Sequence, residues 1–306
     1  MGASPSKMIP KLLVAVCLAL VPASALAEEA GGEAEYYGDD EECLACHDDV
    51  LEHFEQTVHA KVLRPGVART SLMLRGCEAC HGPAAVHVES EGETLGEGLL
   101  HLRPDGTEDP ALQIAACLGC HDDSERRYWY GGAHDAAEVS CTECHTLMKK
   151  VSRENLLSAR TETKTCSSCH PIARSRLYRN AHMPVREEKM SCSSCHNPHG
   201  TIADNLITDH TVNDMCYRCH AEKRGPFLWD HPPVYEDCLN CHLAHGSTRH
   251  AMLKLSQPRL CQQCHPTGHA GPARSSLDRD VVGKSCLHCH EAVHGSNHPA
   301  ATGLTR

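Results

Sequence analysis

The apolar positions of this chain are concentrated in one run close to its start. Residues 12–20 are all apolar, Lys7 and Lys11 precede them, and Ala25-Leu26-Ala27 follows. A short apolar run between positive charges and an A-x-A sequence is typical of a cleaved secretory signal peptide. The run is too short for a transmembrane helix, which needs about 20 apolar residues. We therefore predict a signal peptide at residues 1–27 and an exported mature chain.

After the signal peptide, the apolar pattern predicts only short helices. Residues 48–63 have a helical composition, with Leu51, Phe54 and Val58 near one face. Asn213 is a candidate N-cap for a later helical turn. Pro and Gly recur at short intervals and favour turns, and no run of strands is visible. No later stretch approaches about 18 apolar residues, so we expect no transmembrane helix in the mature chain.

The composition lacks the large apolar side chains from which a chain of 306 residues would build a core. Phe and Trp number two each, and aromatic residues make up 4%, while the chain has 21 Cys and 25 His. The hydrophobic fraction of 41% includes the cysteines; without them it is roughly a third, below the ~45–50% typical of globular domains. Something other than side chains has to supply buried apolar surface.

The mature chain is acidic. Removal of the signal peptide removes two lysines and leaves 27 basic against 40 acidic side chains, a net charge of −13. This charge argues against nucleic acid as a partner. Residues 28–42 form an acidic, glycine-containing leader, which we expect to be mobile.

All 20 cysteines that follow the signal peptide belong to ten copies of one motif, Cys-x-x-Cys-His. The cysteines are Cys43 and Cys46, Cys77 and Cys80, Cys117 and Cys120, Cys141 and Cys144, Cys166 and Cys169, Cys192 and Cys195, Cys216 and Cys219, Cys238 and Cys241, Cys261 and Cys264, and Cys286 and Cys289. The histidines that close the motifs are His47, His81, His121, His145, His170, His196, His220, His242, His265 and His290.

The spacing within this motif has a physical reason. Residues i, i+3 and i+4 share one face of a helical turn, so two thiols can form thioethers to one haem while the imidazole ligates its iron. The motif is the attachment signature of c-type haem. A disulfide framework or zinc sites would not require a His after every second Cys, ten times over. We therefore predict ten covalently bound c-type haems, whose flat apolar rings supply the missing core and allow folding.

The motifs are organised as five pairs. Odd-numbered and even-numbered motifs each recur about every 48 residues, after a longer first pair. Such a period is typical of modules that stack on their neighbours. The extra segment of the first pair, residues 89–110, has the composition of a surface loop. We predict a multihaem cytochrome c fold, mostly irregular with short α-helices and little or no β-structure. The expected elongated array has five two-haem units: residues 43–110, 111–163, 164–210, 211–257 and 258–306.

The 15 histidines outside the motifs bear on the other side of each iron. A second histidine gives a closed electron-transfer site, whereas an open position permits substrate chemistry. Every unit has a His between its two motifs, and four units have another soon after the second motif. These nine predicted distal ligands are His59, His87, His134, His182, His199, His231, His245, His269 and His294.

The second unit breaks the pattern. Met148 lies where His199 and His245 lie in their units, three residues after the motif histidine. Either Met148 is a thioether ligand of one haem with a raised potential, or a remote histidine, His298 or His101, is the tenth distal ligand. A five-coordinate iron is the third possibility and would reopen catalysis.

Several segments resemble the periplasmic decahaem cytochromes of the MtrA/DmsE type, over nearly the whole mature chain. The most specific are residues 215–231, 238–247, 260–265 and 294–299. The resemblance implies bis-histidine haems at the nine distal positions, with a departure at Met148. Members of this family pass electrons through an outer-membrane β-barrel to an outer-surface multihaem cytochrome or an extracellular terminal reductase. Some relatives carry electrons inward from ferrous iron.

We therefore expect an electron carrier without catalytic residues, exported to the periplasm and associated with the outer membrane. The implied partners are a β-barrel porin, an outer-surface cytochrome or terminal reductase for metals or DMSO-like acceptors, and periplasmic or inner-membrane cytochrome donors. A soluble periplasmic shuttle without a barrel is the alternative. A multihaem reductase of nitrogen or sulfur oxides is disfavoured because all ten motifs close with His and spare histidines suffice to fill the irons.

Overall fold

The computed structural model describes residues 35–305 apart from residues 39, 105–106, 124 and 267–283. The predicted signal peptide, part of the acidic leader and the predicted distal ligand His269 lie outside the described residues. The residues from Glu35 onward form one compact unit by their contacts.

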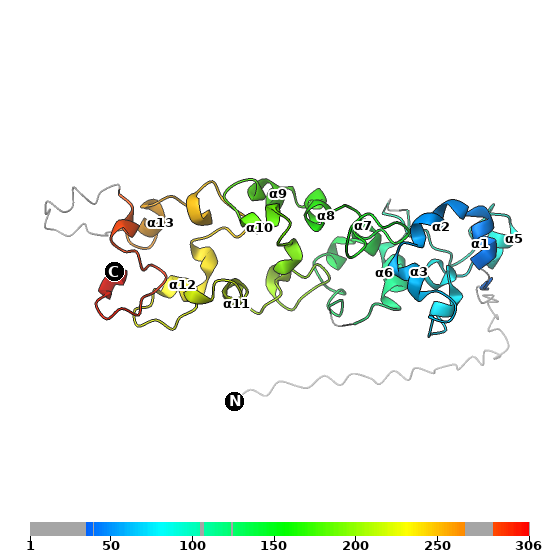
Figure 1. The fold of residues 1–306 in the computed structure, drawn as a ribbon, viewed down its shortest axis with the longest axis horizontal. Helices are drawn as coiled ribbons and strands as arrows, with labels where there is room; N and C mark the ends of the chain where they lie inside the picture. Colours follow the sequence, from blue (N-terminus) through cyan, green and yellow to red (C-terminus); the bar gives the residue numbers. More distant parts are fainter. Residues whose placement is uncertain (1–34, 39, 105–106, 124, 267–283, 306) are drawn as a thin grey trace, which may run out of the picture. The chain divides into compact units, whose positions relative to one another are not determined.

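The regular structure consists of short helices joined by irregular connections (Figure 1). No α-helix in the described ranges exceeds nine residues, and these ranges contain isolated β-bridges but no strand. The predicted fold, a mostly irregular multihaem cytochrome with short α-helices, is confirmed in this respect. None of the described helices has the length and hydrophobicity needed to cross a bilayer.

The helices are distributed along the whole described chain. The α-helices are α1 (Asp40–Cys46), α2 (Asp48–Phe54), α3 (Val58–Val62), α4 (Glu78–His81), α5 (Ala85–Glu89), α6 (Pro110–Leu118), α7 (Cys141–Cys144), α8 (Glu162–Cys169), α9 (Pro171–Leu177), α10 (Met183–Arg186), α11 (Val212–Tyr217), α12 (Pro232–Glu236) and α13 (Arg259–Gln262). The 3-10 helices are η1 (Met73–Arg75), η2 (Asp135–Ala137), η3 (Cys192–Ser194), η4 (Asp204–Leu206), η5 (Ala221–Lys223), η6 (Cys238–Asn240), η7 (His250–Met252), η8 (Cys286–His288) and η9 (Thr302–Leu304).

Residues 48–63 form two helices where the apolar pattern predicts one. α2 ends at Phe54, and α3 begins at Val58. Thr57 separates them because its side chain caps α3: the Ala60 N–H donates to Thr57 Oγ1 at 3.3 Å. The threonine hydroxyl thus starts a new helix within a segment of helical composition.

The prediction that Asn213 is an N-cap is wrong. Thr211 caps α11, where its Oγ1 accepts the Asp214 N–H at 3.0 Å. Asn213 lies inside the helix, and its buried side chain makes bonds to the next motif instead. A short polar side chain near a helix start can serve either role, and the long-range contact decided between them.

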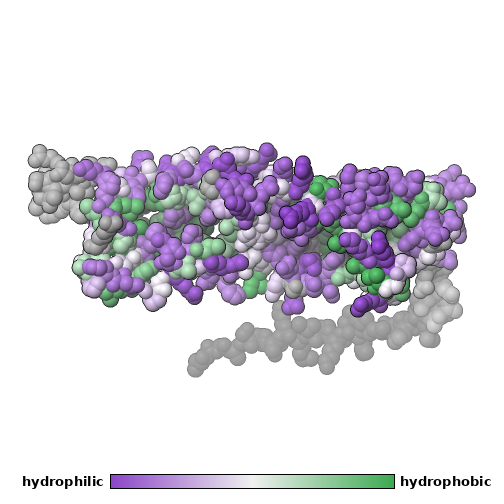
Figure 2. Space-filling model, in the orientation of Figure 1, coloured by the Kyte–Doolittle hydropathy of each residue, from purple (hydrophilic) through white to green (hydrophobic). Residues whose placement is uncertain are grey.

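The side-chain core is as small as the composition predicts. Four of the eight buried apolar residues in the described chain are alanines, and the two most completely buried larger side chains are Gln113 and Thr57. On the face shown in Figure 2, hydrophobic residues occur in small groups among hydrophilic ones. Apolar burial contributes only about 25 cal/mol per Å², so side chains alone provide little stabilisation here.

Each of the ten motifs forms one helical turn. In every motif the N–H of the closing histidine donates to the carbonyl of the first cysteine, at 2.9–3.1 Å. Odd-numbered motifs continue α1, α6, α8, α11 and α13, whereas even-numbered motifs form single turns such as α4, α7 and η3. This i to i+4 turn is the geometry that the spacing predicts for two thiols and an imidazole on one face.

A polar side chain joins the two motifs of every unit. The side chain lies three or four residues before the first motif and bonds to the start of the second. These joins are Asp40 Oδ1 with Cys77 N–H (2.8 Å), Gln113 Oε1 with Thr142 Oγ1 (2.7 Å), Glu162 Oε1 with Ser193 N–H (2.6 Å), Asn213 Oδ1 with Cys238 N–H (2.7 Å), and Gln257 Oε1 with Ser285 Oγ. Each joining residue precedes its own motif and in three units lies before the predicted unit boundary.

A second contact joins neighbouring units from the second to the fifth. Gly200, Gly246 and Gly295 each follow a predicted distal histidine and have φ of 111–118°. A Cβ at these positions would lie 1.9 Å from the Tyr128 carbonyl oxygen, 2.5 Å from that of Arg176 and 2.2 Å from the Phe227 ring, respectively. The histidine–glycine turns therefore pack directly on the preceding unit, and only glycine fits there.

Candidate haem-binding sites

Predicted ligands from distant parts of the chain lie opposite one another as pairs of imidazoles. Seven pairs join a motif histidine to a predicted distal histidine, with ring centroids 5.9–6.3 Å apart. A histidine nitrogen ligates a metal at about 2 Å and the ring centre lies about 1 Å behind it, so two rings sharing one ion lie about 6 Å apart. The pairs are His47–His87, His121–His59, His145–His199, His170–His134, His196–His245, His242–His294 and His265–His231.

The pairing crosses from unit to unit, which the sequence pattern does not reveal. Three even-numbered motif histidines, His145, His196 and His242, face a histidine of the following unit. Three odd-numbered ones, His121, His170 and His265, face a histidine of the preceding unit. The first motif differs, because His47 and His87 come from the same unit.

Hydrogen bonds to backbone carbonyls orient many of these rings. Even-numbered motif histidines bond through Nδ1: His81 to Leu100, His145 to Asn155, His196 to Asn205, His242 to Ala251 and His290 to Gly303, at 2.6–3.1 Å. Distal histidines do the same: His87 to Thr94, His134 to Pro198, His182 to Ala244 and His231 to Val293, at 2.8–3.0 Å. A carbonyl only accepts, so Nδ1 carries the proton and Nε2 presents a lone pair, which is the usual arrangement of a metal-bound histidine.

His59 and the predicted ligands outside the seven pairs have different surroundings. His182 makes the same kind of Nδ1 bond to a backbone carbonyl as His134 and His231. It also occupies the same position in its unit, between the two motifs. His59 is paired with His121, but its Nδ1 is buried with no hydrogen-bond partner among the described residues. The motif histidines His81, His220 and His290 are not among the seven pairs. The three candidates for the tenth distal ligand, Met148, His101 and His298, are all exposed.

Burial favours the neutral, metal-binding form of several of these histidines. It lowers the pKa of His59, His199, His245 and His294, and neighbouring histidines lower the pKa of each further. The pKa of the motif histidine His121 is also lowered, mainly by burial. A neutral imidazole has the lone pair that iron requires.

The motif cysteines form an unbroken series of neighbours in sequence order. Within units, the first cysteines of the two motifs lie within hydrogen-bonding reach: Cys43–Cys77, Cys117–Cys141, Cys166–Cys192, Cys216–Cys238 and Cys261–Cys286. Between units, burial raises the pKa of the second cysteine of each even motif, and the second cysteine of the next motif raises it further: Cys80–Cys120, Cys144–Cys169, Cys195–Cys219 and Cys241–Cys264. Five hydrogen-bonding pairs within units and four electrostatic pairs between units together link all ten motifs.

The donor set fits haem and does not fit zinc. Among the described residues, the clusters that could hold a bare metal ion are Asp40 with Cys43 and Cys77, and Glu162 with Cys166 and Cys192. Neither cluster contains a histidine, because the motif histidines face distant imidazoles instead. A structural zinc site would gather its Cys and His donors in one tetrahedron.

Helical attachment turns, opposed imidazoles and a continuous series of cysteine pairs define a multihaem c-type cytochrome, a class of electron-transfer proteins. Residues 182–225 and 231–270 match the family described as "Doubled CXXCH motif". The chain is also 39% identical over 277 residues to the multihaem cytochrome MtrA of Shewanella baltica (strain OS185), an alignment that spans 86% of this chain and 80% of that protein. The chain therefore belongs to the MtrA family of multihaem cytochromes.

Proposed function

We propose that this cytochrome binds ten c-type haems and conducts electrons along them in sequence order. The observation that carries the proposal is the series of cysteine pairs from Cys43–Cys77 to Cys261–Cys286, in hydrogen-bonding reach within units and electrostatically coupled between units. Each motif is linked to the motifs next to it in the sequence, so no haem attachment point is isolated. Bound haem iron supplies a one-electron change between its ferric and ferrous states.

The chain's own residues hold and tune this path. Twenty cysteines would anchor the rings, the ten motif histidines would ligate the irons, and nine further histidines (His59, His87, His134, His182, His199, His231, His245, His269 and His294) would close their other sides. Backbone carbonyls that accept the Nδ1 protons fix the ring orientation. A closed iron exchanges electrons with little change of ligand, and no residue is required for bond chemistry.

The haem count and the closed irons can be tested on the purified protein. Pyridine haemochrome analysis and the mass of the intact protein should give ten covalent haems per chain. The reduced protein should show almost no spectral change with carbon monoxide, because no position on the iron is open. A carbon monoxide complex at one haem or more would favour the multihaem reductase instead.

We further propose that the path crosses the outer membrane, inside a β-barrel partner. The similarity to an MtrA cytochrome and the acidic mature chain support this setting. An outer-surface cytochrome or a terminal reductase would lie at one end, with periplasmic or inner-membrane cytochromes at the other. The same haem ligation serves electron flow out of the cell and electron flow into it.

Cell fractionation distinguishes this conduit from a soluble periplasmic shuttle. A conduit should remain with the outer membrane after periplasmic release and should co-purify with a barrel protein in detergent. Vesicles that contain this complex and an internal reduced dye should reduce an external acceptor, and vesicles with the barrel alone should not. Complete release with the periplasm would overturn the conduit and support the shuttle.

A further inference from the structure

The regular units indicate which residue faces the histidine of an even-numbered motif. His145, His196 and His242 face His199, His245 and His294, at 5.9–6.2 Å between ring centroids. His199 and His245 are the third residue after the second motif histidine of the following unit, whereas His294 is the fourth. With the spacing of the third and fourth units, the partner of His81 is the third residue after His145, which is Met148; the fourth residue, as in the fifth unit, is Lys149.

A second periodic contact leads to the same turn. His134, His182 and His231 donate through Nδ1 to the carbonyls of Pro198, Ala244 and Val293, and each of these carbonyls directly precedes the turn histidine of the following unit. The member of this series in the first unit is His59, and the corresponding carbonyl is that of Leu147.

Among the described residues the structure does not form this bond, but it leaves unpaired the nitrogen of His59 that would make it. This nitrogen, Nδ1, is buried and has no partner within the part of the chain that the structure describes. The His59 ring faces that of His121, the first motif histidine of the second unit, at 5.9 Å between ring centroids. The turn that carries Met148 belongs to this same unit.

We infer that Met148 is the axial ligand opposite His81, on the haem anchored by Cys77 and Cys80. This inference rests on the proposed binding of haem at every motif. It assigns a thioether to one identified haem, at the second position of the series, where the other even-numbered motifs of units two to four face histidine.

The remote histidines do not fit the place opposite His81. Leu100 N–H donates to the His81 carbonyl at 2.7 Å, and His81 Nδ1 bonds to the Leu100 carbonyl at 3.1 Å. Leu100 is thereby held on the Nδ1 side of the ring, opposite the iron-facing Nε2, and His101 follows directly after it. His101 is held there by its own N–H, which donates to Glu108 Oε2 at 2.9 Å.

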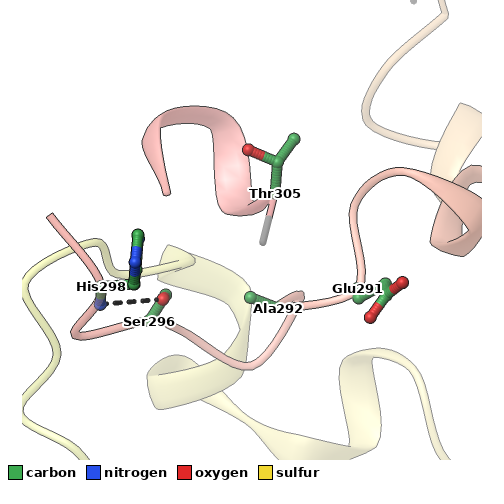
Figure 3. Close-up of a pocket in the computed structure, with 5 residues that line it drawn as sticks. All are labelled: Glu291, Ala292, Ser296, His298 and Thr305. Carbon is green, nitrogen blue, oxygen red and sulfur yellow. Dashed lines mark hydrogen bonds between the residues drawn. The ribbon is translucent and has the colours of Figure 1, made fainter. Parts of the chain in front are cut away.

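His298 belongs to the other end of the series. It lines a cavity of about 490 Å³ together with Glu291 and Ala292, the two residues that follow the tenth motif histidine (Figure 3). Its backbone N–H donates to Ser296 Oγ at 3.2 Å, within the same turn region. His298 is therefore placed beside His290 and not beside the second motif.

The neighbouring residue explains why a methionine suits this turn. The other turns have glycine after the ligand because a Cβ would meet the preceding unit, whereas this turn has Lys149. A turn that carries a lysine Cβ cannot approach the preceding unit as closely. Methionine has three rotatable bonds and a flexible thioether, so it can reach an iron from a displaced turn where a rigid imidazole could not.

Methionine ligation raises the potential of a haem relative to a second histidine. The second haem would then hold an electron more strongly than its neighbours on either side. A single high-potential site one step from the end of the series would retain an electron there between transfers.

Near-infrared absorption of the oxidised protein tests the assignment. The loaded protein should show a thioether-to-iron(III) charge-transfer band with the intensity of one haem. Met148→Leu should abolish the band with the haem count unchanged. Met148→His should also abolish it and should move the highest reduction step to lower potential. Met252→Leu, at a distant methionine in the fourth unit, should keep the band.

Each outcome of this test has one meaning. No band in a protein that carries ten haems would overturn the inference while leaving the proposed function intact, and so would a band that survives Met148→Leu. Fewer than ten haems in the parent protein would count against the proposed function itself. A crystal structure of the loaded protein should place Met148 Sδ on the iron attached to Cys77 and Cys80; a sulfur on another iron would overturn the assignment.

Discussion

The join between the first and second units differs from the three joins that follow it. In the later joins, a histidine–glycine turn packs on the preceding unit, the histidine of that turn faces a motif histidine of the preceding unit, and the inter-motif histidine bonds to a carbonyl of the turn. At the first join the turn contains Met148 and Lys149, and His59 lacks the carbonyl bond. The joins inside the units show no such contrast, because all five have a polar side chain between their motifs.

The two kinds of join therefore have separate tasks. The join within a unit fixes the two attachment turns relative to each other, and it is present even where the repeat is otherwise irregular. The join between units brings the predicted ligands together, and it is the one that varies. A difference in ligation can thus arise at one junction without disturbing the spacing of the attachment points.

The carbonyls that accept the Nδ1 bonds of the motif histidines also distinguish the first unit from the later ones. In the second, third and fourth units the carbonyl that orients the motif histidine belongs to the first of two consecutive left-handed residues, as at Asn155 and Leu156. In the first unit it belongs to Leu100, which is not left-handed. Left-handed non-glycine residues are strained by roughly 1–2 kcal/mol each, so the regular units bear a cost that the first unit avoids.

The largest expected effect is that of Gly200→Ala at the second join. The new Cβ would meet the Tyr128 carbonyl in a left-handed conformation, so we expect a loss of about 2 kcal/mol or more in the free energy of unfolding. Denaturant titration of the loaded protein measures this loss. Gly131→Ala is the matched control, because Gly131 also has positive φ (77°) but open space around its Cβ, and it should lose only about 1 kcal/mol. Equal losses in the two variants would contradict the packing argument.

A smaller effect is expected where a join within a unit is removed. Asn213→Ala removes the acceptor for the Cys238 N–H and the donor to the Val234 and Tyr235 carbonyls, so the free energy of unfolding should fall by about 1–3 kcal/mol. Asp40→Ala, in the irregular first unit, should cost a similar amount. Asn213→Asp keeps the acceptor and should lose less. If Asp40→Ala were neutral while Asn213→Ala was costly, the first unit would differ inside as well as at its join.

The smallest effect is expected from repair of the first join. Lys149→Gly alone should change the free energy of unfolding by less than about 0.5 kcal/mol, as is usual for surface positions. Combined with Met148→His it restores the turn of the later units, so the two changes should be coupled favourably by about 0.5 kcal/mol or more. A double-mutant cycle measures this coupling. Strict additivity would mean that the first join is irregular for reasons outside this turn.

The local features were predictable from the sequence, and the long-range ones were not. Motif spacing dictates the helical turn from Cys43 to His47, and the scarcity of Phe and Trp predicts the small core. The partner of each distal histidine depends on how units dock. His199 lies 54 residues from His145, and no local pattern encodes that approach. The role of Asn213 was misjudged for the same reason, since its partner Cys238 lies 25 residues away.

The pairing of histidines from neighbouring units has a consequence for biogenesis if the proposed sites bind haem and the chain is exported from its N-terminus as predicted. His47 and His87 would then be presented together, so the first site could be completed within one short stretch. The site at His145 would have to wait until residue 199 has crossed the membrane, and the site at His242 until residue 294. Maturation would lag export by one unit along the chain, and the haem-attachment machinery would meet sites that still lack their second histidine.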